Sequence, residues 1–259
     1  MAVVETFFEI RCKAGWKRIM MVDALKKIKL LLALALVLSL GACTPAVVKQ
    51  TLTGTGDVYY LDSTAGQFPL FPAPPLPGSD TDQADLKVLH EWQAKRTAAE
   101  CTRARAEARG NFESLFGNVS PFHRPLPPEV AAFFKHVHAD LDYAVGTVKE
   151  RYQRPRPVWR GFGITPCIDI IGGYAYPSGH AANARLFALI LSDLSPDRRA
   201  EFMARADEAA LNRVIGGVHY PTDIEAGKRL AEAIYTDLHK NLAFQRDEEV
   251  LKKYVVIKD

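Results

Sequence analysis

The sequence predicts an all-α domain. No stretch of any length in the 259 residues alternates apolar and polar side chains, as a half-buried strand would. Apolar residues instead recur three, four and seven positions apart, in segments that end at glycine or proline. With 48% hydrophobic and 24% charged residues, the chain has the composition of a globular protein with a substantial core. We therefore expect a single compact helical domain.

The first 42 residues are expected to be removed. Three lysines precede an apolar run over 30–40, which is too short to span a bilayer and is typical of a secretory signal peptide. The run ends in Leu-Gly-Ala-Cys43, which resembles a bacterial lipobox, in whose products the cysteine is lipidated; in the alternative, cleavage occurs elsewhere and Cys43 is incidental. Residues 1–19 precede this signal, which suggests a start site assigned too early. We predict export to the periplasm and a lipid anchor in the membrane through Cys43.

Residues 43–80 are predicted to form a lipidated tether and an irregular, proline-rich arm. Five prolines between Pro69 and Pro77 exclude a helix and disfavour an inner strand. The arm is expected to lie across the domain or a partner subunit, and a plain linker is the alternative.

The region 81–245 is predicted to hold the helices of the domain. The clearest helix opens at Glu129 and is ended by Pro155 and Pro157. A Ser-Pro-Asp sequence at 195–197 is typical of a helix start, and two glycines at 216–217 end that helix. The expected helices cover 82–108, 129–154, 179–191, 195–214 and 221–238. Residues 246–259 are expected to form a charged C-terminal tail.

Cysteines and charge add two expectations. Cys101 and Cys167 remain after export to an oxidising compartment, where a disulfide between them and two buried thiols are equal alternatives. The net charge of +3 is small and the charged residues are interspersed. No basic stripe of the kind that nucleic-acid binding needs is present, so we expect no nucleic-acid partner.

A short stretch at 178–180 predicts an anion site. Ser178 and Gly179 stand at an expected helix start, where backbone N–H groups lack partners within the helix and bind phosphate well. His180 would lie at the mouth of such a site. The alternative is an ordinary helix cap followed by a surface histidine.

A second stretch predicts an oriented histidine. His219 and Asp223 are four residues apart across an expected helix start, so the carboxylate can accept a hydrogen bond from one ring nitrogen. That bond leaves the other nitrogen available as a nucleophile or base. The alternative is a helix-capping aspartate beside a partly buried histidine.

Basic residues complete the pattern. Lys149 and Arg156 lie upstream and Arg213 precedes His219. Several fixed cations suit the charge that develops on phosphoryl oxygens during transfer, although any one alone would be read as solvated surface. His136 and His138 are two apart on one helix, so they make a poor metal pair and are expected at the surface or in a second layer.

Taken together, these residues resemble the signature of the type 2 phosphatidic acid phosphatase (PAP2) superfamily. The pattern is Lys-x6-Arg-Pro, then Pro-Ser-Gly-His, then Arg-x5-His-x3-Asp, in that order. The chain is most similar to the bacterial class A non-specific acid phosphatases, over roughly 57–245. Two positions depart from the usual pattern: Asn212 replaces a serine and Ala181 a threonine. An asparagine amide can still donate a hydrogen bond to phosphate.

The resemblance implies a role for each residue. His219 would attack phosphorus and become phosphohistidine, Asp223 would orient it, and His180 would protonate the leaving alcohol. It also implies a helical fold of the acid phosphatase and vanadium haloperoxidase type, no metal or other cofactor, and a possible homo-oligomer. The substrates would be small phosphorylated metabolites, hydrolysed at acid pH. The phosphoryl oxygens would be held by Lys149, Arg156, Arg213, Ser178 and Gly179.

Three other functions stay open at this point. A lipid-anchored enzyme could hydrolyse lipid or isoprenoid phosphates at the membrane surface. A vanadium-dependent haloperoxidase would use a similar pocket for vanadate, although such enzymes are generally larger. An envelope lipoprotein that binds phosphate without turnover is a non-enzymatic alternative, which the presence of both histidines disfavours.

Overall fold

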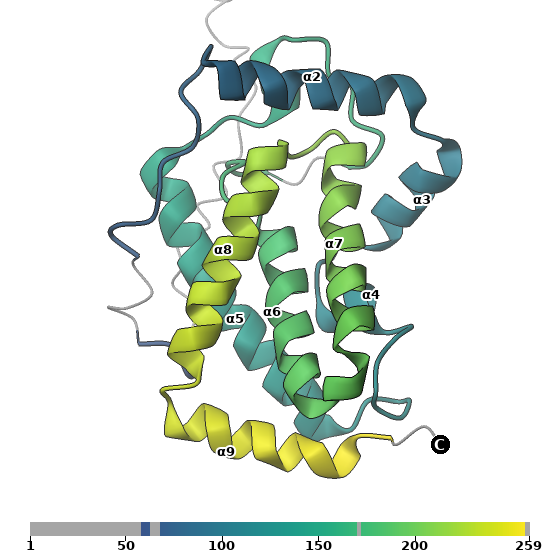
Figure 1. Ribbon diagram of the computed structural model, residues 1–259, viewed down its shortest axis with the longest axis vertical. Helices are drawn as coiled ribbons and strands as arrows, with labels where there is room; N and C mark the ends of the chain where they lie inside the picture. Colours follow the sequence, from purple (N-terminus) through teal and green to yellow (C-terminus); the bar gives the residue numbers. More distant parts are fainter. Residues whose placement is uncertain (1–57, 63–67, 170–171, 257–259) are drawn as a thin grey trace, which may run out of the picture. The chain divides into compact units, whose positions relative to one another are not determined.

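The computed structural model describes residues 58–62, 68–169 and 172–256, all within one compact unit, and the regular elements that these residues form are helices (Figure 1). Within them there is no strand, only an isolated bridge between Phe122 and Val255. The expected all-α fold is therefore confirmed. The expected signal peptide, Cys43 and most of the tether lie outside the described residues. The helices are α2 (Asp80–Lys95), α3 (Ala98–Ala106), α4 (Phe112–Phe116), α5 (Pro128–Tyr152), α6 (Gly179–Leu194), α7 (Arg199–Ile215), α8 (Pro221–Leu238) and α9 (Leu242–Leu251).

The helix α6 forms the centre of the fold. It packs against α5, α7 and α8 (Figure 1), and its Phe187 and Ile190 are completely buried. A helix that is apolar on most of its faces is stable only when other elements surround it. At Gly227 on α8, a Cβ atom would lie 2.4 Å from the carbonyl oxygen of Ser178. Glycine at this position therefore lets α8 approach the first turn of α6, which brings the two predicted catalytic stretches together.

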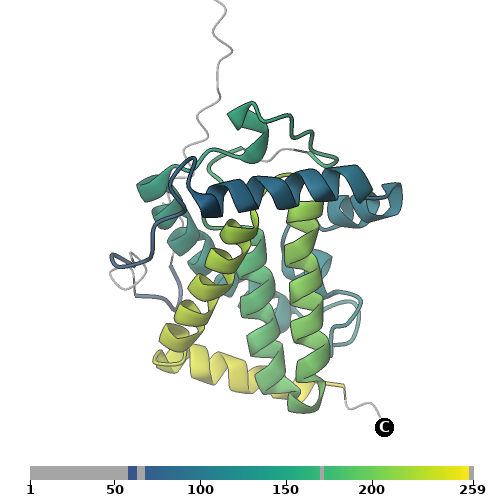
Figure 2. The same cartoon turned by 45° about the horizontal axis from the view of Figure 1, so that its top comes forward.

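The helix expected over 82–108 is two helices. Arg96 is extended, and Thr97 starts α3 with a capping box in which its side chain and that of Glu100 bond each other's backbone N–H groups. This Thr-x-x-Glu signature favours a new helix start, and the interruption lets α2 and α3 follow different directions. As a result α2 lies across the α7–α8 end of the fold (Figure 2), while α3 packs on α7.

The C-terminal region differs from the expected charged tail. Residues 246–251 belong to α9, and Phe244 and Leu251 of that helix are buried in the main core. The boundary expected at 245 therefore falls inside a helix. Asn241 caps α9 by accepting hydrogen bonds from two backbone N–H groups.

The arm before α2 lies across the domain where it is described. The backbone N–H groups of Tyr59, Tyr60 and Leu61 donate to the carboxylate of Asp140 on α5, at 2.6, 2.8 and 3.1 Å. The side chains of Tyr60 and Leu61 are buried in the main core. None of the described helices is both long and apolar enough to cross a membrane.

A disulfide fixes the loop between α5 and α6. Cys101 on α3 and Cys167 in the loop are joined, with their Cα atoms 5.8 Å apart. The Cys167 N–H donates to the carbonyl of Gly216 at 3.1 Å, and Arg105 donates to the Cys167 carbonyl at 2.7 Å. The loop is thereby held against the end of α7, next to the segment that carries His219.

Candidate active site

A cavity of about 430 Å³ lies where α5, α6, the end of α7 and the α5–α6 loop meet. Six of the eight residues predicted from the sequence to act in catalysis or phosphate binding line it. The other two, Ser178 and Asp223, are completely buried and lie directly beside residues that do. The six lining residues are Lys149, Arg156, Gly179, His180, Arg213 and His219.

His219 is held in one tautomer by partners on both ring nitrogens. Its Nδ1 lies 3.3 Å from Oδ2 of Asp223, which can only accept, and its Nε2 lies 3.1 Å from the Arg156 guanidinium, which can only donate. The proton is therefore on Nδ1 and the lone pair on Nε2. Burial, followed by the charges of Arg156 and Lys149, lowers the pKa of His219 well below its usual 6.5. The ring is thus a neutral imidazole with its lone pair on the cavity side.

Asp223 is itself fixed by Arg154, which the sequence analysis did not identify. Arg154 donates to Oδ1 of Asp223 at 2.6 Å and to Asp85 on α2 at 2.9 Å, and its guanidinium lies 3.9 Å from the ring centre of Tyr220. The Tyr220 N–H donates to the second carboxylate oxygen of Asp223 at 3.0 Å. Burial raises the pKa of Asp223, and Arg154 opposes that shift. No periodicity or motif of the sequence distinguishes Arg154 from its neighbours.

His180 stands in the first turn of α6, where Ser178 is the N-cap and accepts from the N–H of Ala181 at 3.3 Å. The ring packs against Gly110, at which a Cβ atom would lie 3.0 Å from Nδ1. Its Nε2 is buried and has no hydrogen-bond partner in the described part of the chain. Burial, followed by the charge of Arg213, lowers the pKa of His180 well below 6.5.

Three cations converge on the same cavity. Burial and then the neighbouring Arg156 lower the pKa of Lys149 to about 7, and its ammonium donates to the carbonyl of Tyr174. Burial lowers the pKa of Arg156 and of Arg213 to about 10. Burial away from water is the main cause of all three shifts, and the charge of Arg156 adds to it for Lys149 and Arg213. An anion bound between these groups would remove much of that cost.

Comparison with known proteins places this chain in a family. The model of the PAP2 superfamily matches residues 138–240. The non-specific acid phosphatase of Salmonella typhimurium is 34% identical over 198 residues, which cover 71% of this chain and 78% of that protein. The chain belongs to the PAP2 superfamily. The non-specific acid phosphatase of Providencia stuartii is 28% identical over 216 residues, covering 78% of this chain and 86% of that protein.

Solved structures show the same fold for this PAP2 domain. A bacterial vanadium-dependent chloroperoxidase in its holo form superposes with a TM-score of 0.53 at 13% identity. The superposition covers 77% of this chain and 55% of that chain. A bacterial vanadium-dependent iodoperoxidase superposes with a TM-score of 0.51 at 18% identity, over 70% of this chain and 54% of that one. At these identities the likeness concerns the fold alone.

The wall of the PAP2 cavity includes a histidine that the sequence analysis left in an outer layer. Nδ1 of His138 lies 2.8 Å from Oδ1 of the buried Asn183, and Nε2 lies 3.2 Å from a carboxylate oxygen of Asp142. All three residues line the cavity. The helical spacing shows which face of α5 carries His138, but not that α6 supplies Asn183 opposite it. Neither position belongs to the three-part signature.

Asn212, which the sequence analysis considered as a phosphate contact, binds Glu107 instead. Its amide donates to Oε2 of Glu107 at 3.0 Å, and Arg205 holds the other oxygen of that carboxylate. Asn212 is buried and is absent from the residues that line the cavity. Asn212 therefore ties α7 to the end of α3, and its amide donates to Glu107 and not to a phosphate.

Proposed function

We propose that this protein is an exported acid phosphatase of the PAP2 type that hydrolyses phosphate monoesters through a phosphohistidine at His219. The observation that carries the proposal is the single tautomer of His219, whose Nε2 lone pair adjoins a cavity with three cations. A neutral imidazole held in this way is a nucleophile, and the cations suit the charge on a transferring phosphoryl group. The acid phosphatase relatives from Salmonella and Providencia support the same activity.

In the first step, Nε2 of His219 forms a bond to phosphorus and the bond from phosphorus to the ester oxygen breaks. Arg156, which donates to Nε2 in the free site, turns to the phosphoryl oxygens instead, together with Lys149. His180 gives its proton to the departing alkoxide, so that an alcohol leaves. Asp223 compensates the positive charge on the phosphorylated ring through its contact with Nδ1.

In the second step, water attacks phosphorus and the bond to Nε2 breaks. The neutral His180 accepts a proton from the water, which restores both histidines and releases phosphate. His180 has to begin the cycle protonated, whereas its pKa in the free site is low. The negative charge of a bound phosphate raises that pKa, so the substrate itself loads the acid. Three fixed cations supply the charge stabilisation, and the proposed reaction uses no metal ion.

The test is hydrolysis of a chromogenic aryl phosphate across pH, with and without a chelator. His219→Ala should lower kcat by about 1,000-fold or more, as expected for loss of a nucleophile. The exposed His123→Ala is the matched control and should retain full activity. A phosphorylated histidine should be detected by mass spectrometry after rapid quenching at alkaline pH, and only in proteins that carry His219.

Other outcomes would replace this proposal. Substantial turnover by His219→Ala would remove the assigned nucleophile. Peroxidase activity with added vanadate and no hydrolysis would favour the haloperoxidase alternative, and hydrolysis confined to lipid or isoprenoid phosphates would favour an enzyme of the membrane surface. Phosphate binding without turnover would identify a binding protein.

We also propose that the mature protein is periplasmic and anchored through lipid on Cys43, which lies outside the described residues. The disulfide between Cys101 and Cys167 supports an oxidising compartment. In the native host, Cys43→Ala should move the protein from the membrane fraction to the soluble fraction. Retention of this variant in the membrane fraction would refute the anchor.

A further inference from the structure

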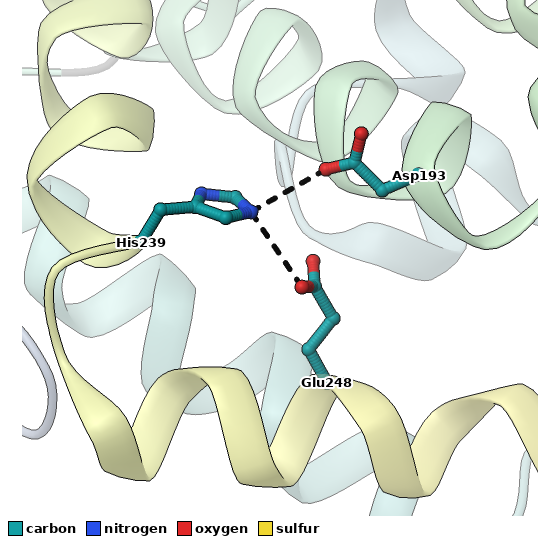
Figure 3. Close-up of side chains that lie close together, drawn as sticks. All are labelled: Asp193, His239 and Glu248. Carbon is teal, nitrogen blue, oxygen red and sulfur yellow. Dashed lines mark ion pairs between the residues drawn. The ribbon is translucent and has the colours of Figure 1, made fainter.

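A second cluster of ionisable side chains lies far from the catalytic cavity. It joins Asp193 at the end of α6, His239 directly after α8, and Glu248 in α9 (Figure 3). Nε2 of His239 lies 3.5 Å from Oδ2 of Asp193 and 3.5 Å from Oε2 of Glu248. One nitrogen or oxygen atom of each residue falls within 4.8 Å of the others.

The imidazole of His239 is oriented before any ligand arrives. Its Nδ1 lies 2.9 Å from the backbone carbonyl oxygen of Tyr235, which can only accept, so the proton is on Nδ1. The ring centre is 4.3 Å from that of Tyr235 and 5.0 Å from that of Phe244. The Nε2 lone pair therefore faces the two carboxylates. Metal-binding histidines in proteins commonly donate their other ring N–H to a backbone carbonyl in this way.

The two carboxylates place further electron-rich atoms around that lone pair. The Glu248 side chain is only 13% exposed, and its Oε1 is buried without a hydrogen-bond partner in the described part of the chain. Tyr235 donates its hydroxyl to Oδ2 of Asp193 at 2.6 Å, which fixes that carboxylate. Three acceptors that converge on one point are stabilised by a cation between them.

We propose that Asp193, His239 and Glu248 form a binding site for a divalent metal ion of the zinc type. Ligand atoms about 2.0–2.2 Å from a tetrahedral zinc ion are about 3.3–3.6 Å apart. The two separations of 3.5 Å from Nε2 match this spacing. Three protein ligands leave a fourth position for water. An imidazole with two carboxylates favours zinc over magnesium and calcium, which prefer oxygen alone.

The position of this site indicates a structural role. His180 and Asp193 lie at opposite ends of α6, about 20 Å apart along the axis at about 1.5 Å per residue. A metal bound here would join α9 to the ends of α6 and α8, and none of its three ligands lines the catalytic cavity. The inference is therefore independent of the proposed phosphatase mechanism.

The test uses the full-length protein after removal of bound metals by chelation. Calorimetric titration should show one zinc ion bound per chain with a dissociation constant of about 10 µM or lower, and thermal unfolding should shift upward with zinc. Substituted cobalt should give the intense visible absorption of a tetrahedral ion. Magnesium should produce none of these effects. Hydrolysis of an aryl phosphate should stay the same with and without zinc.

Glu248→Gln and Glu249→Gln form a matched pair. Glu249 is adjacent in sequence, but it is exposed and pairs with Lys252. Glu248→Gln should weaken zinc affinity by about 100-fold or more, since losing even an outer partner of a metal ligand costs about 10–100-fold. Glu249→Gln should bind as the native protein does.

Asp193→Asn removes a second carboxylate ligand. The amide oxygen of the variant can still accept the hydrogen bond from Tyr235, so that contact is kept. The variant should also lose the cobalt absorption. Absence of zinc binding to the native protein at about 100 µM would overturn the site and leave His239 paired only with the two carboxylates. Unchanged affinity in both Glu248→Gln and Asp193→Asn would do the same.

Discussion

The ring of His180 is positioned by a glycine at the close of the α3–α4 turn. Gly110 has a φ of +63°, and a Cβ atom there would lie 3.0 Å from Nδ1 of His180. We expect Gly110→Ala to displace the ring and lower kcat by about 10-fold or more, because small misplacements of catalytic groups are costly. KM should change much less. Steady-state kinetics with an aryl phosphate measures both.

Gly78→Ala is the control for backbone strain. Gly78 has a φ of +81°, and nothing lies within 4 Å of the position of its Cβ. Both substitutions should cost about 1–2 kcal/mol of stability, the usual penalty for an L-residue in this region. Only Gly110→Ala should lose activity. An equal loss of kcat in the two variants would show that strain, and not contact with His180, is responsible.

At the scale of elements, Arg154 connects three separate parts of the fold. It follows the end of α5 and its guanidinium binds Asp82 and Asp85 on α2 and Asp223 on α8. We expect Arg154→Met to lower the free energy of unfolding by about 3–5 kcal/mol, since it leaves buried carboxylates without their partner. The rate should fall as well, because Asp223 loses a hydrogen bond that fixes its position. Denaturant unfolding and kcat are the measurements.

Arg103→Met is the comparison for Arg154→Met, because Arg103 is exposed and lies 4.0 Å from the nearest carboxylate oxygen. It should alter stability by less than about 0.5 kcal/mol, as surface substitutions usually do. If Arg154→Met retained the native stability and kcat, the buried ion pairs of Arg154 would have no role in holding Asp223.

The elements also show which parts of the structure are accessible to sequence analysis. Helices such as α5 and α8 follow from apolar spacing and from proline and glycine at their ends, and the spacing within 219–223 defines a local pair. The contacts of Arg154 join residues 69 and 72 positions apart. Local pattern carries no information on such contacts. For the same reason, the sequence analysis did not identify the cluster of Asp193, His239 and Glu248. Its members come from three different helices or helix ends.

At the scale of the whole molecule, protonating the histidines of the proposed catalytic cavity disfavours folding. His180 and His219 have pKa values well below 6.5 in the folded protein. Below about pH 6.5 the unfolded chain therefore binds more protons than the folded one, and their contribution to stability is lost as pH falls. Lys149, with a pKa of about 7 against its usual 10.5, acts in the same direction between these values. Each contribution is fully present only above the ordinary pKa of its group.

A bound phosphate should favour protonation of His180 in the folded protein, which is the reverse of the effect in the free site. Because the anion raises the pKa of His180, binding takes up a proton, and linkage then makes binding tighter as pH falls. At about 100 times its dissociation constant, phosphate should add about 2.7 kcal/mol. For a domain of this size that corresponds to about 5–10 °C in Tm.

We expect the rise in Tm at one fixed phosphate concentration to be larger at pH 5.5 than at pH 8 in thermal unfolding experiments. His180→Ala should lose most of this pH dependence and His123→Ala should keep it, because His123 is exposed. The comparison separates the charge of the phosphate from that of the histidine. The phosphate becomes less negative at low pH, which alone would weaken binding to three cations. A shift in Tm that is larger at pH 8 would therefore mean that phosphate charge dominates and that His180 does not take up a proton on binding.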